Sequence, residues 1–407
     1  MTMQSPQQAP DHQQQQQNAQ NQRVGWTDEV WERIHAEVHH ELTRARVAAK
    51  FLPCVHVPAK TLSVPADVVT LPSDPTNFAP GAMTIDEGVT LRINEFWTEF
   101  VMTPAQVQHE GAEEAAMGHA QHPDPTHQPH AANHGHTSHH VSTGITLATR
   151  AANLLAQAED MLILQGASAL LSPMFGNGTM PLPVSNSNTP NAAGVSYRGV
   201  PSDLGLLNLP LGPAGSFPQS PFTNAIPPIY VHRVQPPART PQLLAYQEDT
   251  VAGVAQGVSA LQAAGQCGPY ALVLETVPWA DTNSPLKTTL ILPSTPIKEL
   301  VTAGFHVTGT LPPWNLQSAT TGAKNGLPST PPNLPSGANV LYTGVLLSLG
   351  GHPVDVVRCH LHKNHDALVT YEQTDQNGNL HFRIRQRFAL RLKDITAMVP
   401  LLFIDQP

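Results

Sequence analysis

The chain has 407 residues, enough for two or more compact units, and only 13% of them are charged. Its 40 prolines and 28 glycines exclude long uninterrupted stretches of regular helix or sheet. A formal net charge of −9 makes a nucleic-acid partner improbable, and three widely spaced cysteines give no disulfide framework and fit a reducing cytosol. No window of about 18 apolar residues occurs, so we expect a cytoplasmic protein without a membrane span.

The N-terminal region is expected to combine a polar arm, one amphipathic helix and extended strands. Residues 1–23 are Gln-rich without an apolar run, which predicts a disordered arm and no signal peptide. A helix capped by Thr27 is predicted within 24–52, with apolar side chains at spacings of three and four residues. Residues 53–103 alternate weakly and are broken by prolines, as in a protruding arm or edge strand. The apolar stripe of the helix includes Trp31, Ile34, Val38 and Leu42.

Residues 104–142 form a polar insertion that is dense in histidine. Imidazole nitrogens bind zinc, copper or nickel, and H-x-x-H recurs in this segment. However, prolines interrupt it, no cysteine lies nearby and no H-E-x-x-H motif is present, so its ligands lack the fixed geometry of a catalytic site. We predict a weakly metal-binding, non-catalytic loop, with a metal-handling role as the alternative. Its histidines are His119, His122, His127, His130, His134, His136, His139 and His140.

The middle of the chain alternates between helical and proline-rich segments. Residues 143–171 predict a long helix that stops at Gly166. The Pro-rich segment 172–242 predicts a surface excursion with short strands such as 227–234. Within 243–310 we expect three elements, and a second Pro-rich insertion follows over 311–338. The three elements are a helix over 247–262, a buried strand over 268–275 and a short helix that is capped by Thr295 and ends at Gly304.

Residues 339–407 predict a set of C-terminal strands, of which "LHFRIRQRFALRL" has the sharpest pattern. Apolar and basic side chains alternate along it, which predicts a half-buried strand with a basic outer face. The arginines could bind phosphate or an acidic partner, but such a row more often pairs with carboxylates on a neighbouring strand or subunit. The inner residues include Phe382, Ile384 and Phe388, and the outer residues include Arg383, Arg385 and Arg387.

Two smaller histidine groups are interpreted as structural. His35 and His39 are one turn apart on the first predicted helix and could clip a metal, but a solvated helix face is the prediction. A second group, next to Cys359, gives only a weak zinc signal because no second cysteine is near. It comprises His360, His362 and His365. The sequence has no G-x-S-x-G, P-loop, G-x-G-x-x-G or C-x-x-C motif, so we predict neither an enzyme nor a cofactor.

The order of these segments resembles the encapsulins, the linocin-type bacterial nanocompartment shell proteins that share the tailed-phage major-capsid fold. The family usually has a Gly-Gln-Asp turn where "RCHLHKNHD" stands here, and the insertions enlarge this chain. The segments that carry the resemblance are "WTDEVWERIHAEVHHELTRARVAAKFL", "LRINEFWTEFVMTPAQV", "LATRAANLLAQAEDMLILQGASALL", "GPYALVLE", "TPIKELVTAGFHVTGTLP", "GVLLSLGGHPVDVVRCHLHKNHDALVTYEQ" and "HFRIRQRFALRLKDITAMVPLL".

The resemblance implies an α+β, phage major-capsid-like fold with a peripheral domain, an axial domain, an extended loop and an N-terminal lumenal helix. It assigns 53–103 to the extended loop and peripheral strands, 243–310 to the axial domain, and 339–407 to the C-terminal strands of both domains. Residues 172–242 would decorate the exterior or contact a neighbouring subunit, and the arm 1–23 would point inward.

The same resemblance implies that many copies close into an icosahedral cage around a cargo enzyme, such as a ferritin-like protein or a peroxidase. Cargo would dock through a short C-terminal targeting peptide, in a groove to which Trp31, Ile34, Val38 and Leu42 contribute. Alternatively, the same subunit covers that stripe. Two other functions stay open, a phage or prophage major capsid protein that packages DNA and a metal-binding protein that uses the His-rich loop. The net negative charge of the chain disfavours the packaging of DNA.

Overall fold

The computed structural model describes most of the chain outside the insertions, and it confirms the predicted α+β class. The Gln-rich arm, the eight insertion histidines and residues 312–338 lie outside the described residues. The described residues are 24–70, 84–86, 88–110, 142–175, 194–199, 205–207, 226, 228–232, 246–285, 290–311, 339–363 and 365–405.

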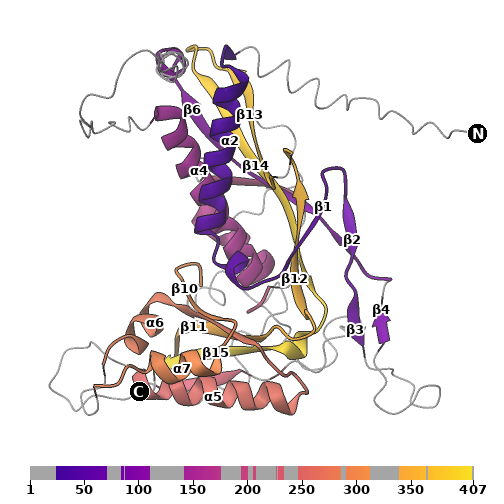
Figure 1. Cartoon of the computed structure of the whole chain (residues 1–407), viewed down its shortest axis with the longest axis vertical. Helices are drawn as coiled ribbons and strands as arrows, with labels where there is room; N and C mark the ends of the chain where they lie inside the picture. The colour runs from indigo at the N-terminus through magenta and orange to yellow at the C-terminus, as the bar shows by residue number, and fades with distance from the viewer. Residues whose placement is uncertain are drawn as a thin grey trace, which may run out of the picture.

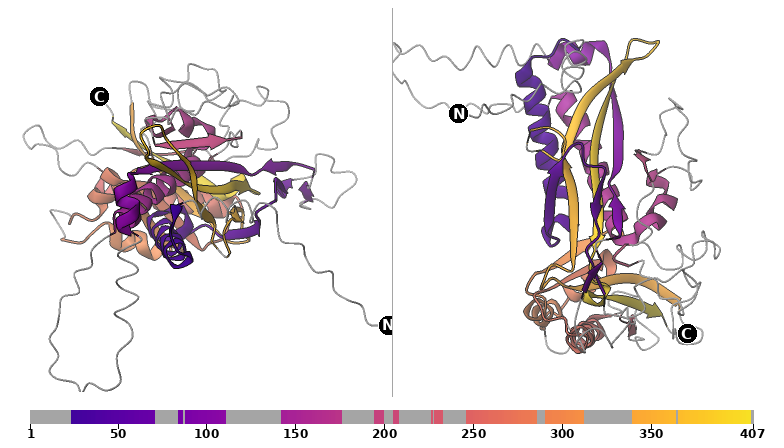
Figure 2. Two further views of the ribbon diagram at one scale, coloured as in Figure 1. Left: turned by 90° about the horizontal axis from the view of Figure 1, so that it is seen from above. Right: turned by 90° about the vertical axis from the view of Figure 1, so that its right-hand side faces the viewer.

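A six-stranded sheet and two long helices form the elongated upper part of the molecule in Figure 1. Helix α4 packs on β6 and β14, and α2 lies beside α4 and against β13 (Figure 2). The strand order is β1-β12-β14-β6-β7, with β13 paired to β14. The elements are α2 (Asp28–Ala45), α4 (Thr143–Gln165), β1 (Cys54–Pro58), β6 (Asn94–Met102), β7 (Val195–Arg198), β12 (Val354–His360), β13 (Ala367–Thr374) and β14 (Leu380–Leu392).

Helix α2 begins and helix α4 ends where their capping residues predict, whereas α2 ends at Ala45, before the predicted limit at residue 52. The Thr27 side chain accepts a hydrogen bond from Val30 N, and acidic side chains in the first turn of α2 suit the positive end of the helix dipole. Ser142 caps α4 by accepting from Ile145 N at 3.1 Å. The chain leaves α4 at Gly166, whose φ of 61° lies in the left-handed region that glycine adopts without strain. The predicted cap of α2 and the predicted stop of α4 are therefore confirmed.

A five-stranded sheet with three helices forms the lower part of the molecule (Figure 1). Helix α5 packs on β8, β15 and β11, where Gly257 lets the helix approach the sheet closely because a Cβ there would lie 2.8 Å from Leu346 Cδ2. The strand order is β10-β9-β11-β15-β8. The elements are α5 (Gln247–Ala263), α6 (Thr276–Thr282), α7 (Ser294–Leu300), β8 (Ile229–His232), β9 (Tyr270–Glu275), β10 (Gly304–Thr308), β11 (Asn339–Ser348) and β15 (Met398–Asp405).

Two sequence predictions for the short helix in this lower part are wrong, because Thr295 does not cap it and because it ends at Leu300, before Gly304, which begins β10. Helix α7 starts at Ser294 after Pro293, so Thr295 lies inside the first turn, and no side chain caps the helix. Pro296 is tolerated there because the first turn of a helix has no intrahelical partner for its N–H groups. Helix α6 was not predicted. The helix predicted over 247–262 and the buried strand predicted over 268–275 are both confirmed.

A narrow β arm projects from the body beside β1 and β12 (Figure 1). It consists of two antiparallel strand pairs, β2 with β5 and β3 with β4. The arm strands are β2 (Ser63–Pro65), β3 (Val68–Thr70), β4 (Thr84–Asp86) and β5 (Thr90–Arg92). Four short 3-10 helices complete the described elements, namely η2 (Ala48–Lys50), η3 (Gly166–Leu171), η4 (Pro173–Phe175) and η5 (Ile395–Ala397). Residues 104–110 are helical and lead into the histidine-rich segment.

The two sheets share one hydrophobic core. The largest cluster of buried side chains joins α2, α4 and the six-stranded sheet to one face of β9 and β11, and a second cluster lies under α5. Within the described residues, no helix is both long enough and apolar enough to cross a bilayer.

Candidate functional site: helix α2 on the six-stranded sheet

The apolar stripe of α2 is buried inside its own subunit. Trp31 and Ile34 are 5% and 1% exposed, Val38 is 1% exposed and Leu42 is fully buried. Helix α2 turns this stripe toward α4 and β13, so the hydrophobic core of the subunit takes up the surface that cargo would need. The same subunit therefore covers the stripe, as the stated alternative has it, and these side chains form no open docking groove in this structure.

Aromatic side chains hold the N-terminal end of α2. The Trp26 ring stacks on Phe382 of β14, with ring centroids 5.0 Å apart and planes inclined by 13°. Its indole N–H donates to the Val107 carbonyl at 3.1 Å, so the one polar group of the ring is satisfied in the core. Phe100 of β6 stacks on the same phenylalanine at 5.1 Å. These contacts fix the start of the helix against two neighbouring strands.

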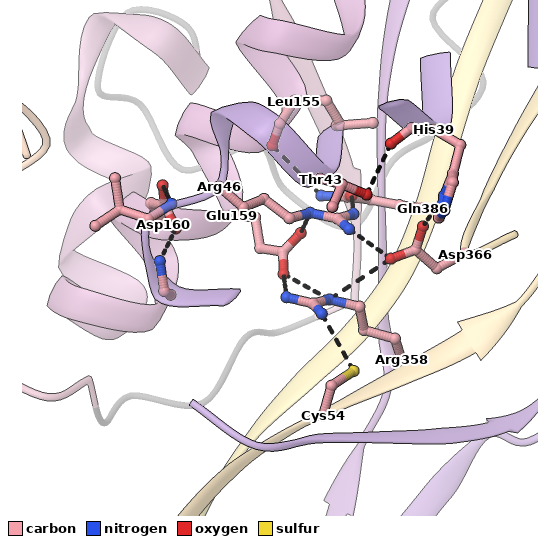
Figure 3. Close-up of polar contacts among 12 residues, drawn as sticks. His39, Thr43, Arg46, Cys54, Leu155, Glu159, Asp160, Arg358, Asp366 and Gln386 are labelled. Carbon is pink, nitrogen blue, oxygen red and sulfur yellow. Dashed lines mark hydrogen bonds and ion pairs between the residues drawn. The ribbon is translucent and has the colours of Figure 1, made fainter. Parts of the chain in front are cut away.

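A buried network of ion pairs holds the C-terminal end of α2 (Figure 3). Arg46 Nε lies 2.6 Å from Glu159 Oε2 of α4, and its Nη1 lies 2.5 Å from Asp366 Oδ2, which precedes β13. Arg46 also donates to Gln386 of β14 at 2.7 Å. On the other side of Glu159, Arg358 of β12 donates through Nε at 2.8 Å and Nη2 at 2.5 Å. Two arginines thus face two carboxylates, and the four side chains are at most 6% exposed.

The four charged side chains stabilise the fold only when all of them are present, because each charge has been removed from water. Burial by itself raises the pKa of the Asp366 carboxyl, but Arg46 and the other donors together hold it well below its usual range. Burial likewise opposes the charge of Arg358, yet Glu159 raises its pKa above the ordinary value. Loss of one member would leave a partner charged and buried, which typically costs about 3–5 kcal/mol.

A third buried carboxylate, Asp160, anchors the backbone just beyond α2. It accepts hydrogen bonds from Val47 N at 2.7 Å and Ala48 N at 2.9 Å, where η2 begins. Burial raises the pKa of Asp160 to about 7, although both backbone donors favour the ionised form. Glu159 and Asp160 therefore tie the same helix, α4, to Arg46 and to the two residues that follow it.

His35 occupies the middle of the α2 contact and is 3% exposed, so the predicted solvated face is wrong for this residue. Its Nδ1 lies 2.7 Å from the Trp31 carbonyl, and its Nε2 lies 3.2 Å from Val369 N of β13. The ring stacks on His362 at 4.1 Å, and His39 lies 4.4 Å from His365. Burial, and next to it the charge of His362, lowers the pKa of His35 to about 4.

The alternating strand β14 buries its apolar side chains and pairs its arginines within the subunit. Phe382 and Ile384 are fully buried, and Phe388 is 4% exposed. Arg383 lies 2.7 Å from Glu99 and 3.2 Å from Glu372, whereas Arg385 reaches Glu95 only at 3.8 Å. Arg387 donates to the Thr61 carbonyl of the arm at 2.8 Å and also to the Ala59 carbonyl. The row thus joins neighbouring strands and the base of the arm.

The ends of the histidine-rich segment lie next to each other. Glu110 Oε2 accepts a hydrogen bond from Gly144 N at 3.1 Å, so the chain enters and leaves the segment at one place. In the described ranges, no group of three or more His, Cys, Asp or Glu side chains is arranged to hold a metal ion, and this includes His360, His362 and His365. The eight histidines of the insertion lie outside those ranges.

Two apolar surfaces of the described chain are exposed. On the arm, Leu62 is 71% exposed and Ile85 is 61% exposed. Next to α7, Leu290 is 80% exposed, and Ile291 and Leu292 continue the patch. Beside this patch lies a cavity of about 360 Å³ between α5 and the start of α7. Its lining includes Val251, Ala252, Ala255, Ile291, Leu292 and Pro293. In both Figure 1 and the left panel of Figure 2, the arm and the α6–α7 region lie on opposite sides of the molecule.

Comparison with solved structures finds shell proteins. A virus-like particle from Pyrococcus furiosus is 12% identical, with a TM-score of 0.43, over 91% of this chain and 98% of that one. The capsid of an empty GTA particle is 11% identical, with a TM-score of 0.44, over 89% and 90%. The SrpI encapsulin from Synechococcus elongatus is 9% identical, with a TM-score of 0.38, over 87% and 85%.

An encapsulin and several capsid proteins are thus among the structures to which this chain is similar. No protein-family model and no curated protein sequence matches the chain. Because every one of these TM-scores is below 0.5, we base the proposal below on the surfaces of the chain itself.

Proposed function

We propose that the chain is the subunit of a self-assembling, closed protein shell. The observation that carries this proposal is the pair of exposed apolar surfaces on opposite sides of one subunit, the arm and the α7 patch. Leu62 and Ile85 mark the arm, and Leu290 marks the patch, each with more than 60% of its surface exposed. Leu290, Ile291 and Leu292 form a run of exposed apolar residues, and contiguous exposed apolar surface is typical of protein interfaces.

The position of these surfaces favours repeated head-to-tail assembly over simple dimerisation. A two-fold dimer brings the same patch of both copies together, whereas two different patches on opposite sides pair head to tail. Head-to-tail contacts continue from copy to copy, and they end in a ring or shell when the rotation between copies closes, or form an open filament when it does not. A closed shell is the outcome that we propose. The arm is also tied to the body through Arg391, which lies 2.7 Å from Asp67 of the arm and 2.8 Å from Asp355 of β12. A fixed arm presents its apolar side chains in a defined direction.

For the contents of the shell, we propose a cargo enzyme in a cytoplasmic, encapsulin-type compartment. The net charge of −9 would repel DNA phosphates. The arginines of β14 that could have bound phosphate are instead engaged inside the subunit, Arg383 with Glu99 and Arg391 with Asp355. A DNA-packaging capsid remains the alternative function. Because the apolar stripe of α2 is covered, cargo docking would have to use another surface or a state in which α2 has moved.

Negative-stain microscopy and mass photometry of the purified full chain test the shell. We expect closed particles of uniform size, and a monodisperse monomer or dimer at high protein concentration would contradict the proposal. Leu62→Glu and Ile85→Glu should each weaken assembly, because they place a charge on the arm surface that a neighbour would cover. Thr90→Glu, at an exposed polar position on the same arm, is the matched control and should assemble normally.

The contents are tested on particles purified from the native host. Mass spectrometry of the particles should identify a second protein. The ratio of nucleic-acid to protein absorbance in the ultraviolet should show no stoichiometric nucleic acid. Particles filled with DNA would support the capsid alternative and refute the cargo proposal, while leaving the shell itself in place.

A further inference from the structure

His35 makes two hydrogen bonds of opposite sense, one to the outer edge of β13 and one to the backbone of its own helix, α2. Strand β13 pairs only with β14 in the described chain, so its other edge would be open if α2 did not lie along it. On that edge, Val369 N–H points at His35 Nε2 over 3.2 Å, while His35 Nδ1 contacts the Trp31 carbonyl at 2.7 Å. The imidazole is thus the polar link between helix and strand at this point.

These two bonds admit only one protonation state of the ring. A backbone carbonyl can only accept, so His35 Nδ1 must carry the proton, and a backbone N–H can only donate, so Nε2 must be bare. Protonation of Nε2 would set two donors against each other across the contact with Val369. The docked helix therefore requires a neutral His35, and this conclusion follows from the identity of its partners.

The surroundings of the ring also disfavour a cation. The ring stacks on His362, and a second positive charge there would be repelled. The carboxylate in reach, Glu32, is already engaged by Lys363 at 2.6 Å and by His362 at 3.3 Å, at the solvent-exposed end of the contact. Asp366 is held by Arg46. The titratable and charged groups that face this contact from α2 and the turn before β13 are Glu32, His39, His362, Lys363, His365 and Asp366.

We propose that α2 is an acid-sensitive latch on the edge of β13, and that protonation of His35 releases it. Release would expose the edge amide of Val369 and the apolar side chains that α2 now buries, including Ile34 and Val38. A pH change would thereby turn a covered surface into an accessible one. The latch is a property of the single subunit and does not depend on whether the chain forms a shell.

The direction and size of the effect follow from proton linkage. The undocked ring would titrate near the ordinary pKa of 6.5, whereas the pKa of the docked ring is lowered to about 4. The undocked state then binds more protons below pH 6.5, so docking is fully favoured above that pH and weakens as the pH falls toward 4. Between pH 7.5 and pH 5.0, these two pKa values weaken docking by about 30-fold.

Hydrogen exchange of the full-chain protein, in whatever assembly state it adopts, tests the latch. Protection factors of the α2 amides and of the Val369 amide are compared at pH 7.5 and pH 5.0, after correction for the intrinsic exchange rate at each pH. We expect the wild type to lose about 30-fold in protection. His35→Gln can still accept from Val369 N–H but does not titrate, so its protection should be nearly independent of pH.

His40→Gln is the matched control, because His40 is an exposed histidine on the same helix, and it should behave like the wild type. Equal losses in His35→Gln and the wild type would overturn the proposal, because another group would then be responsible. If the protection factors of the wild type are the same at both pH values, the proposal is overturned, whether or not either variant folds.

Discussion

Replacing Arg46 by methionine tests the buried ion-pair network. The substitution keeps the length and apolar stem of the side chain but removes the cation that lies between Glu159 and Asp366. Arg358 is then the one remaining cation of the network and faces two carboxylates. It already lies 2.5 Å from Glu159 but 3.7 Å from Asp366, so Asp366 loses its close partner. Gln386 loses a hydrogen bond of 2.7 Å as well.

The size of the effect follows from burial. Arg46, Glu159 and Asp366 have side chains that are 3%, 0% and 5% exposed, so water cannot replace the lost partner. Breaking such a buried pair typically costs about 3–5 kcal/mol. Arg46→Lys keeps the charge but not the planar fork that reaches three partners at once, and it should fall between the wild type and Arg46→Met.

Urea-induced unfolding, followed by the fluorescence of Trp26 and Trp31 at the start of α2, measures the loss. At a slope of about 3 kcal/mol per molar urea, Arg46→Met should lower the midpoint by more than about 1 M. Arg44→Met is the control, because Arg44 pairs with Glu41 on the surface with 66% of its side chain exposed, and its midpoint should match the wild type. Equal midpoints for the two methionine variants would refute the account of the network.

Three further outcomes are expected. Trp26→Ala should lower the stability by about 3–5 kcal/mol in thermal unfolding. Trp26→Phe retains the ring stack and should cost only about 1 kcal/mol, for the lost hydrogen bond. Equal costs for the two variants would contradict the stacking role. Deleting 119–140 should leave particles unchanged in negative stain, because the segment begins and ends at one place, and failure to assemble would show that the loop is needed. Replacing three buried side chains of β14 with aspartate should abolish soluble particles, and normal particles would contradict the strand assignment. These substitutions are Phe382→Asp, Ile384→Asp and Phe388→Asp.

The elements predicted best are those in which the periodicity of apolar residues in the sequence matches the pattern of buried side chains. In β14 an alternation of apolar and basic residues, broken only at Gln386 and Ala389, matches a strand whose inner side chains are buried, so the sequence period alone suffices. In α4 a helical period ends at Gly166, and the structure places the helix end there. By contrast, α6 is a seven-residue helix that contains Pro278 and directly follows β9, so it is too short to show a period.

The network around Arg46 could not be predicted, because its members come from five separate segments. Arg46, Glu159 and Arg358 are each more than 100 residues apart in sequence, and nothing local marks them as partners. One signal was available, since the adjacent acidic residues Glu159 and Asp160 stand between apolar residues of α4. His35 was predicted to be solvated because its own helix has an exposed side, and only the position of β13 shows that its face is covered.

The chain crosses between the two sheets by short connections, and one cluster of buried side chains joins the sheets. Strand β11 lies in the five-stranded sheet and β12 in the six-stranded one, while β14 and β15 repeat the crossing in the opposite direction. A hinge between the sheets would have to separate buried side chains of one cluster that includes Val273 of β9 and Val356 of β12. Helix α2 belongs to the same buried cluster, whereas the arm packs on the body through a smaller separate cluster that includes Val64 and Val357 and through the Arg391–Asp67 ion pair. Adjustment between neighbouring copies would therefore fall to the arm, which makes the smaller contact with the body.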